Sequence, residues 1–290
     1  MADQATQAPQ MARTPGAMTL ILRNRGVFWG GLLLTLIVLF ALLAPFFTTD
    51  PTALNPINRL KPPGTGGLFG TDMLGRDVFS RVASGAQISL VVGIAVAVIA
   101  VALGLFLGLI AGYIRLMDAI IMRFMDGLMS IPAILLAIAM ISLSGATLAT
   151  VVLAIVIPEI PRVVRLVRSV VLTVREEPYV EAAISAGTRV PTILVRHVLP
   201  NTIAPLIVQA TYICGSAMLT EAILGFLGAG IPPEIPSWGN IMSEGRTFFQ
   251  LTPWIIFFPG ICLAVTVLAV NVVGDGLRDT LDPRIARNMR

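Results

Sequence analysis

Few residues of the sequence are of the types that catalyse reactions or bind metals, and their positions exclude most such chemistry. The single histidine, His197, cannot form a multi-histidine metal site, and no H-E-x-x-H motif includes it. Cys214 and Cys262 lie inside apolar runs, which leaves no C-x-x-C motif and no disulfide framework. Lys61 is the only lysine, and residues 59–63 lack the glycines and hydroxyl of a phosphate-binding loop. We therefore expect a chain that is not an enzyme and has no catalytic, cofactor or metal site.

The composition places the chain in a membrane. Of its 290 residues 56% are hydrophobic and 12% are charged, whereas about a quarter of a soluble domain is charged. The apolar residues come in runs of about twenty, the length at which a helix crosses the hydrocarbon core of a bilayer. We predict an all-α, polytopic membrane protein with six transmembrane helices. The predicted spans are residues 27–47, 88–113, 119–143, 147–167, 202–224 and 254–273.

The distribution of arginine orients these spans, because cytoplasmic loops collect basic residues. With the N-terminus inside, the inner segments hold fifteen of the twenty Lys and Arg residues, and the outer segments hold five. Both termini are therefore predicted to be cytoplasmic, in tails 1–26 and 277–290, and residues 1–15 lack apolar periodicity, which predicts disorder. The remaining parts are an extracytoplasmic loop at 48–87 and a membrane core at 88–276.

Charged residues near the span ends have the spacings of ion pairs within one helix. The pairs predicted in the outer loop are Asp72 with Arg76 and Asp77 with Arg81. Local i,i+3 pairs are predicted at the start of the third span among Arg115, Asp118, Arg123 and Asp126. The residues interpreted as headgroup anchors at the inner end of the fourth span are Arg162, Arg165 and Arg168.

Two acids lie inside predicted spans, where an ionisable group costs about 2.5 kcal/mol or more at the bilayer centre. Each must therefore face protein, water or a cation. Glu159 has Arg162 one turn away, but Glu221 has no partner in its own span, so lining a pathway and pairing between helices both remain open. Small residues at every fourth position from 100 to 112 predict close helix packing, within this chain or against a partner.

The most polar loop, at about 176–201, joins the fourth and fifth spans on the inner side. Pro178 and Pro191 bound a predicted short helix at 179–190 outside the bilayer. The residues of its surface are Glu181, Ala182, Ala183, Ala186 and Gly187. Such a smooth helix suits the groove of a cytoplasmic partner. The alternative is an interfacial linker helix that binds nothing.

This loop resembles the EAA loop of the inner-membrane permeases of ATP-binding-cassette importers. The residues that carry the resemblance are Glu181-Ala182-Ala183, Gly187 and Leu199-Pro200. His197 stands where the general pattern has an apolar residue, but Arg196-His197-Val198-Leu199-Pro200-Asn201 is similar to the peptide and nickel branch. Further segments resemble the C-type subunit of dipeptide and oligopeptide importers: Phe69-Gly70-Thr71-Asp72, Leu74-Gly75-Arg76-Asp77-Val78-Phe79-Ser80-Arg81, Pro236-Ser237-Trp238-Gly239, and Gly274-Asp275-Gly276-Leu277-Arg278-Asp279 to Leu281-Asp282-Pro283-Arg284.

The resemblance implies the fold of a type I ABC importer permease in a bacterial inner (plasma) membrane. It implies that the chain forms half of a translocation pathway for dipeptides or oligopeptides and contacts membrane lipid but no nucleic acid. The implied partners are a second homologous permease subunit in a heterodimer, two ABC ATPase subunits, which bind the ATP and Mg, and an extracytoplasmic substrate-binding protein. The residues expected to couple to the ATPase are Glu181, Ala182, Ala183, Gly187, His197, Leu199 and Pro200, and the candidate pathway residue is Glu221.

Other functions remain open at this point. The same machinery could carry nickel, glutathione or oligosaccharides. A stand-alone, ion-coupled carrier would need membrane-buried acids as ion sites and often contains inverted repeats. The sequence offers one or two such acids and no long repeat. An intramembrane enzyme is disfavoured because the chain has no catalytic constellation.

Overall fold

The computed structural model describes residues 25–281, and every regular element in this range is a helix apart from an isolated bridge between Thr71 and Asp77. The prediction of an all-α chain is confirmed. The predicted tails lie mostly outside the described residues. The α-helices are α2 (Arg25–Phe47), α3 (Val78–Tyr113), α4 (Arg115–Met129), α5 (Ala133–Ser144), α6 (Leu148–Arg175), α7 (Pro178–Ser185), α8 (Val190–Ile193), α9 (Leu199–Phe226), α10 (Trp238–Gly245) and α11 (Trp254–Leu281). The shorter turns are η1 (Pro56–Asn58), the π-helical η2 (Leu194–Val198) and η3 (Arg246–Phe248).

Four described helical segments are long and apolar enough to cross a membrane, and a bent pair makes up to five. The four are α2, α3, the run Val190–Phe226 that contains α9, and α11 up to Thr280. Helix α6 corresponds to the fourth predicted span, but it is not among these four. Three charged residues, Glu159, Arg162 and Arg165, fall within its first 18 residues and make it too polar. The helices also extend beyond the predicted spans, since α3 begins at Val78 inside the predicted loop 48–87 and α11 continues past residue 276.

The third predicted span, at 119–143, is wrong as a single helix. The chain forms α4 and α5 instead, which meet at an angle of 87°. Pro132 lies in the break, and it disfavours a helical backbone at Ile131, directly before it. The hydroxyl of Ser130 donates to the carbonyl oxygen of Gly127 at 2.7 Å, which satisfies part of the end of α4.

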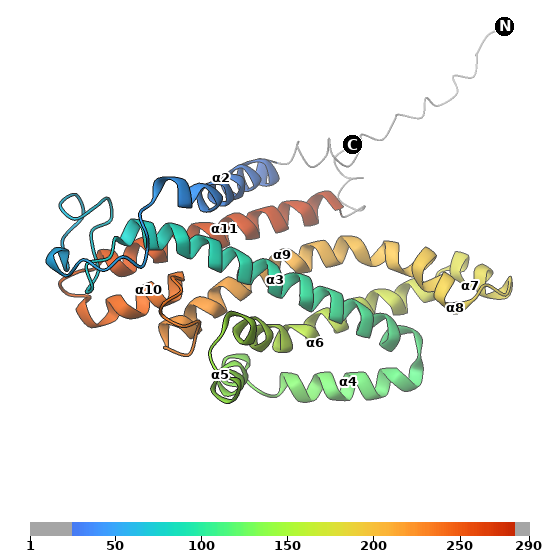
Figure 1. Ribbon diagram of the computed structural model, residues 1–290. Coiled ribbons are helices and arrows are strands. Elements are labelled where there is room, and N and C mark those ends of the chain that lie inside the picture. Colours follow the sequence, from blue (N-terminus) through green and yellow to red (C-terminus); the bar gives the residue numbers. More distant parts are fainter. Residues whose placement is uncertain (1–24, 282–290) are drawn as a thin grey trace, which may run out of the picture.

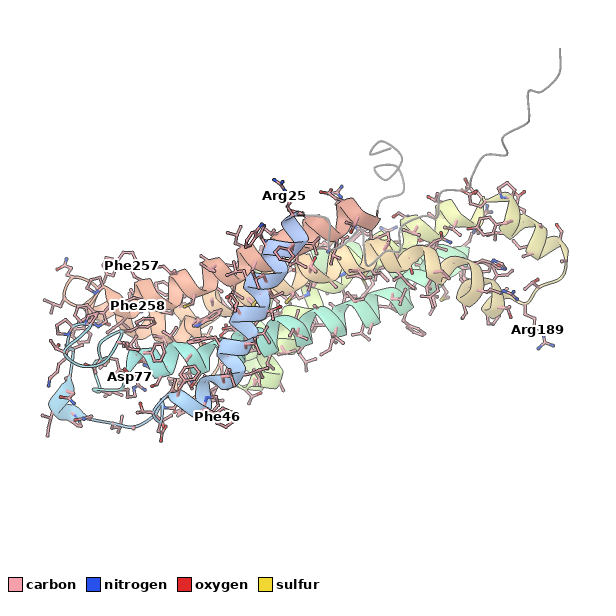
Figure 2. The ribbon with its side chains drawn as sticks, turned by 90° about the horizontal axis from the view of Figure 1, so that it is seen from above. Arg25, Phe46, Asp77, Arg189, Phe257 and Phe258 are labelled. Atoms are coloured by element: carbon pink, nitrogen blue, oxygen red, sulfur yellow. The ribbon has the colours of Figure 1, made fainter. Side chains whose placement is uncertain are left out.

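The long helices α3, α6, α9 and α11 run along one axis of an elongated molecule, and α2 crosses this bundle on one side (Figures 1 and 2). The outer loop and α10 lie at one tip, and α7 and α8 lie at the other (Figure 1). Figure 2 marks the two tips by Asp77 and Arg189. Gly276 of α11 lies against Val27 of α2, so the first and last described helices have adjacent ends.

The most extensive helix packing within the described residues is between α3 and α6. Their contacts pair a glycine of α3 with a valine of α6, at Gly104 with Val163, Gly108 with Val167 and Gly112 with Val171. A Cβ atom at Gly104 would lie 2.4 Å from the Cβ of Val163, so no larger residue fits without a shift. The small residues at 100–112 thus pack within this chain, as close-packed membrane helices do. This packing holds α6, and with it the following 176–201 loop, in a fixed position along α3.

Candidate functional site: the 176–201 loop

Helix α7 begins and ends at residues whose backbone preferences fit those positions. Pro178 occupies its first turn, where the missing N–H is not needed. Gly187 follows the helix with φ +76°, and the N–H of Thr188 donates to the carbonyl oxygen of Ala183 at 3.1 Å. The N–H of Gly187 also donates to Ile184, which completes a Schellman motif. The predicted helix at 179–190 is therefore too long, because the left-handed glycine ends it before Pro191.

One side of α7 is buried. Val180 is fully buried in the same apolar cluster as Val174 of α6, Ile193 of α8 and Val198 of the π-helical turn. Apolar burial of this kind contributes roughly 1.5–3 kcal/mol for each valine or isoleucine side chain. The loop thus has an apolar core that joins it to the end of α6 and the start of α9.

The opposite side of α7 is exposed and consists mainly of small residues. Glu181, Ala182, Ala186 and Gly187 are exposed, and Ala183 is half-buried. The predicted set of coupling residues on α7 is therefore brought together at the tip of the molecule (Figure 1). Ile184 is also exposed, at 47%, although it is a large apolar residue. A surface of small residues beside one exposed apolar side chain suits docking of another protein.

The last three predicted coupling residues lie where the loop joins α9. His197 belongs to the π-helical turn, and Leu199 and Pro200 form the first turn of α9. The side-chain amide of Asn201 donates to the carbonyl oxygen of His197 at 2.6 Å and to the hydroxyl of Tyr179 at 3.3 Å. The ring centroids of His197 and Tyr179 are 5.9 Å apart. His197 thus accepts a hydrogen bond within the loop through its backbone, and these contacts connect α7 to α9.

Glu221 lies inside the chain. Its side chain is fully buried in α9, and the hydroxyl of Ser89 in α3 donates to Oε2 at 3.2 Å. Oε1 has no hydrogen-bond partner within the described residues. Lining of a pathway by Glu221 stays a prediction, and in this structure α3 and α9 close over the carboxyl group.

The ion pairs of α4 and α6 connect the two helices, which corrects two predictions. Asp118 accepts from Arg168 at 2.5 and 2.7 Å, and Asp126 accepts from Arg165 at 2.6 Å. The local pairs predicted within 115–126 are not formed, because the arginines of α6 face the acids of α4. Two of the three arginines interpreted as headgroup anchors therefore bind carboxylates of α4. The predicted pair of Glu159 with Arg162 is confirmed, at 3.2 Å.

Four buried or half-buried charges form a second cluster at the opposite tip, and the sequence predicted only one of its contacts. This four-charge cluster consists of Asp72, Arg76, Arg81 and Glu244 of α10. Asp72 pairs with Arg76 at 2.6 Å, as predicted, though in a turn before α3. The predicted pair of Asp77 with Arg81 is wrong, because Asp77 caps α3 by accepting from the N–H of Ser80 at 2.8 Å. Arg81 reaches Asp72 and Glu244 instead.

Comparison with known families and proteins assigns most of the chain. Residues 100–287 match the family described as the binding-protein-dependent transport system inner membrane component, and residues 17–63 match the N-terminal transmembrane domain of oligopeptide transport permease C. A probable peptide ABC transporter permease protein of Sinorhizobium fredii is 54% identical, with 98% of each chain covered. The dipeptide transport system permease protein of Haemophilus influenzae is 40% identical, over 91% of this chain and 92% of the relative.

Two further comparisons extend this result. The oligopeptide transport system permease protein of Bacillus subtilis is 36% identical, over 93% of this chain and 90% of the relative. Among solved structures, the inward-facing methionine ABC transporter MetNI matches with a TM-score of 0.52 and 20% identity, over 73% of this chain and 96% of that chain. The similarity to MetNI shows the fold of an ABC importer permease.

Proposed function

The chain belongs to the family of binding-protein-dependent transport system inner membrane components, and we propose that it forms half of a peptide pathway that partner ATPases drive through the 176–201 loop. It is a permease subunit of an ABC importer, and its relatives are named for peptides, dipeptides and oligopeptides. The substrate class we propose is therefore short peptides. ATP and Mg are bound by two ATPase subunits, and the other half of the pathway is a second, homologous permease.

The exposed face of α7 carries the proposal. Transport against a gradient requires that free energy stabilise one state of the transporter over another. A permease without a nucleotide site must receive that free energy through a contact with another subunit. Helix α7 is at the tip of the chain, and Val180 fixes it to the bundle. A displacement of α7 by an ATPase is therefore passed to α6 on one side and to α9 on the other.

Orientation follows from the same assignment. The tip with α7 faces the cytoplasm, where the ATPases are, and the tip with α10 and the outer loop faces the substrate-binding protein. The adjacent ends of α2 and α11 support cytoplasmic positions for both termini, in a bacterial inner membrane.

Crosslinking tests the docking surface. A cysteine in place of Ala182, on the exposed face of α7, is expected to crosslink to an ATPase subunit in the assembled complex. The matched control is Thr65→Cys, because Thr65 is exposed at the opposite tip. The natural cysteines, Cys214 and Cys262, are half-buried within α9 and α11. Equal crosslinking of the two variants to the ATPase, or none from Ala182→Cys, would refute the proposed contact.

Reconstitution tests the function. Proteoliposomes with the second permease, the ATPases, the binding protein and ATP are expected to accumulate peptide, and this chain alone is expected to accumulate none. Gradient-driven uptake by the isolated chain would instead establish the stand-alone carrier. Uptake of nickel, glutathione or an oligosaccharide without peptide uptake would reassign the substrate.

A further inference from the structure

Arg162 of α6 is held in a fixed geometry although part of its side chain is exposed. Its Nη1 donates to both carboxylate oxygens of Glu159, at 3.2 and 3.3 Å. Its Cζ lies 5.9 Å from the centre of the Tyr212 ring of α9. Glu159 is buried, whereas the side chain of Arg162 is 44% exposed and Tyr212 is 53% exposed. Together these three residues form what we call the midspan cluster, a guanidinium that an acid orients and an aromatic ring supports.

The packing register of α6 against α3 shows how deep the midspan cluster lies. Val163, which follows Arg162, contacts Gly104 of α3. Helix α3 has no charged residue between Arg81 and Arg115, so Gly104 lies inside a long uncharged stretch. Side chains on a helix point toward its N-terminus. In α6 that direction leads away from the 176–201 loop and toward the middle of the uncharged stretch of α3. The midspan cluster therefore lies deep in the hydrocarbon region.

An exposed arginine at this depth cannot face lipid at low cost. Charged side chains within membrane spans face protein or a water-filled cavity. Arg165 and Arg168, which are nearer to the loop, already bind acids of α4. Nε and Nη2 of Arg162 donate to no atom of residues 25–281 in the contacts that the structure shows. These donors thus need an acceptor that this part of the chain does not provide.

We propose that the midspan cluster is a passage site for the terminal carboxylate of a peptide in transit, an inference that rests on the proposed function. Arg162 is the contacting residue, and Glu159 and Tyr212 are positioning residues. The guanidinium presents Nε and Nη2 in the planar geometry that binds a carboxylate with two parallel hydrogen bonds. Glu159 offsets part of the positive charge, so the carboxylate is held weakly. A site on a pathway must release what it binds, and weak binding meets that requirement.

The test compares a short peptide with its C-terminal amide, which lacks the carboxylate. Maximal uptake is measured in proteoliposomes that contain the complete importer, at saturating concentrations of binding protein loaded with either peptide. Arg162→Gln is expected to lower the uptake of the free peptide about tenfold, the order expected for loss of a charge-assisted hydrogen bond. Uptake of the amide is expected to stay within about twofold of wild type. Arg165→Gln, on the same helix but paired with Asp126, is expected not to distinguish the two peptides.

The inference is overturned if Arg162→Gln lowers both peptides equally or neither. An equal loss accompanied by failure to co-purify with the second permease would identify Arg162 as an interface residue. A wild-type complex that transports no peptide would refute the proposed function itself, whereas a transporting complex without discrimination at Arg162 refutes only the passage site.

Discussion

Asp72 is the centre of the four-charge cluster, and its replacement by asparagine is the most direct test of how the outer loop is held. Its Oδ2 accepts from Arg76 at 2.6 Å and from Arg81 at 2.8 Å. Its Oδ1 accepts from the backbone N–H groups of Leu74 at 2.8 Å and Arg76 at 2.9 Å. The side chains of Asp72 and Arg81 are each 1% exposed. Asparagine has the same shape but no charge, so both arginines would keep only Glu244 as an acid partner.

The expected cost follows from these contacts. Removing one partner of a buried ion pair costs about 3–5 kcal/mol, and the remaining Glu244 places Asp72→Asn near the lower limit, about 3 kcal/mol. A loss of that size lowers the melting temperature by roughly 5 °C in a chain of this size. Glu244→Gln is expected to cost less, because the Glu244 side chain is 19% exposed and Asp72 still pairs with both arginines.

A thiol-reactive fluorogenic dye measures this unfolding, because Cys214 and Cys262 are half-buried in α9 and α11 and react when these helices separate. The matched control is Asp50→Asn, since Asp50 is exposed and the hydrogen bonds shown for its side chain all come from Thr52. Melting of Asp72→Asn at the temperature of Asp50→Asn would show that the four-charge cluster does not stabilise the fold.

Other substitutions test the remaining contacts. Gly108→Leu is expected to destabilise the fold by about 1–3 kcal/mol, because even a Cβ atom at this position would lie 2.6 Å from the Cβ of Val167. Thermal melting measures the loss of stability, and an unchanged melting midpoint would contradict the packing. Gly187→Leu is expected to strain the left-handed turn after α7 and to reduce peptide uptake per ATP hydrolysed, while the protein still inserts into the membrane. A wild-type ratio of uptake to hydrolysis would argue against that role. Arg168→Gln is expected to separate α4 from α6 and to increase proteolysis within α4. The control is Arg115→Gln, because the exposed side chain of Arg115 has no ion pair among residues 25–281. Equal proteolysis of both variants would exclude a tethering role for the pair of Asp118 with Arg168.

The sequence predicted the helical class and four of the spans, those that correspond to α2, α3, α9 and α11, because long uncharged stretches leave few alternatives in a bilayer. The bend at 130–132 was not predicted. Pro132 lies in an apolar run, and the hydropathy of that run alone indicated one continuous span. Likewise, the run of arginines in α6 indicated a membrane boundary, but their acid partners lie 39 and 50 positions away in the sequence. Spacing rules detect pairs within one helix and cannot find pairs between two.

Local spacing in the sequence also predicted the docking surface but only part of the midspan cluster. Glu181, Ala182 and Gly187 were placed together by local helical geometry, and the structure exposes Glu181 and Ala182 on α7 and Gly187 in the turn that follows it. The midspan cluster was only half visible, because Glu159 and Arg162 are one turn apart, whereas Tyr212 comes from a helix that meets them only after folding. Glu244 has no charged partner at helical spacing, so local rules did not identify it. The available signal was its charge, because an isolated acid in one outer segment can pair with Arg76 and Arg81 of the other.

The glycine–valine contacts pack α3 and α6 together as a unit. Helix α3 begins beside the four-charge cluster at one tip, and α6 leads to α7 at the other tip. We therefore expect a displacement of α7 to be transmitted through α6 and α3 together. The helices are interrupted at the sharp corner between α4 and α5 and in residues 227–237 before α10, and Pro158 and Pro161 lie inside α6 itself. Changes of shape during transport are expected to concentrate at these positions.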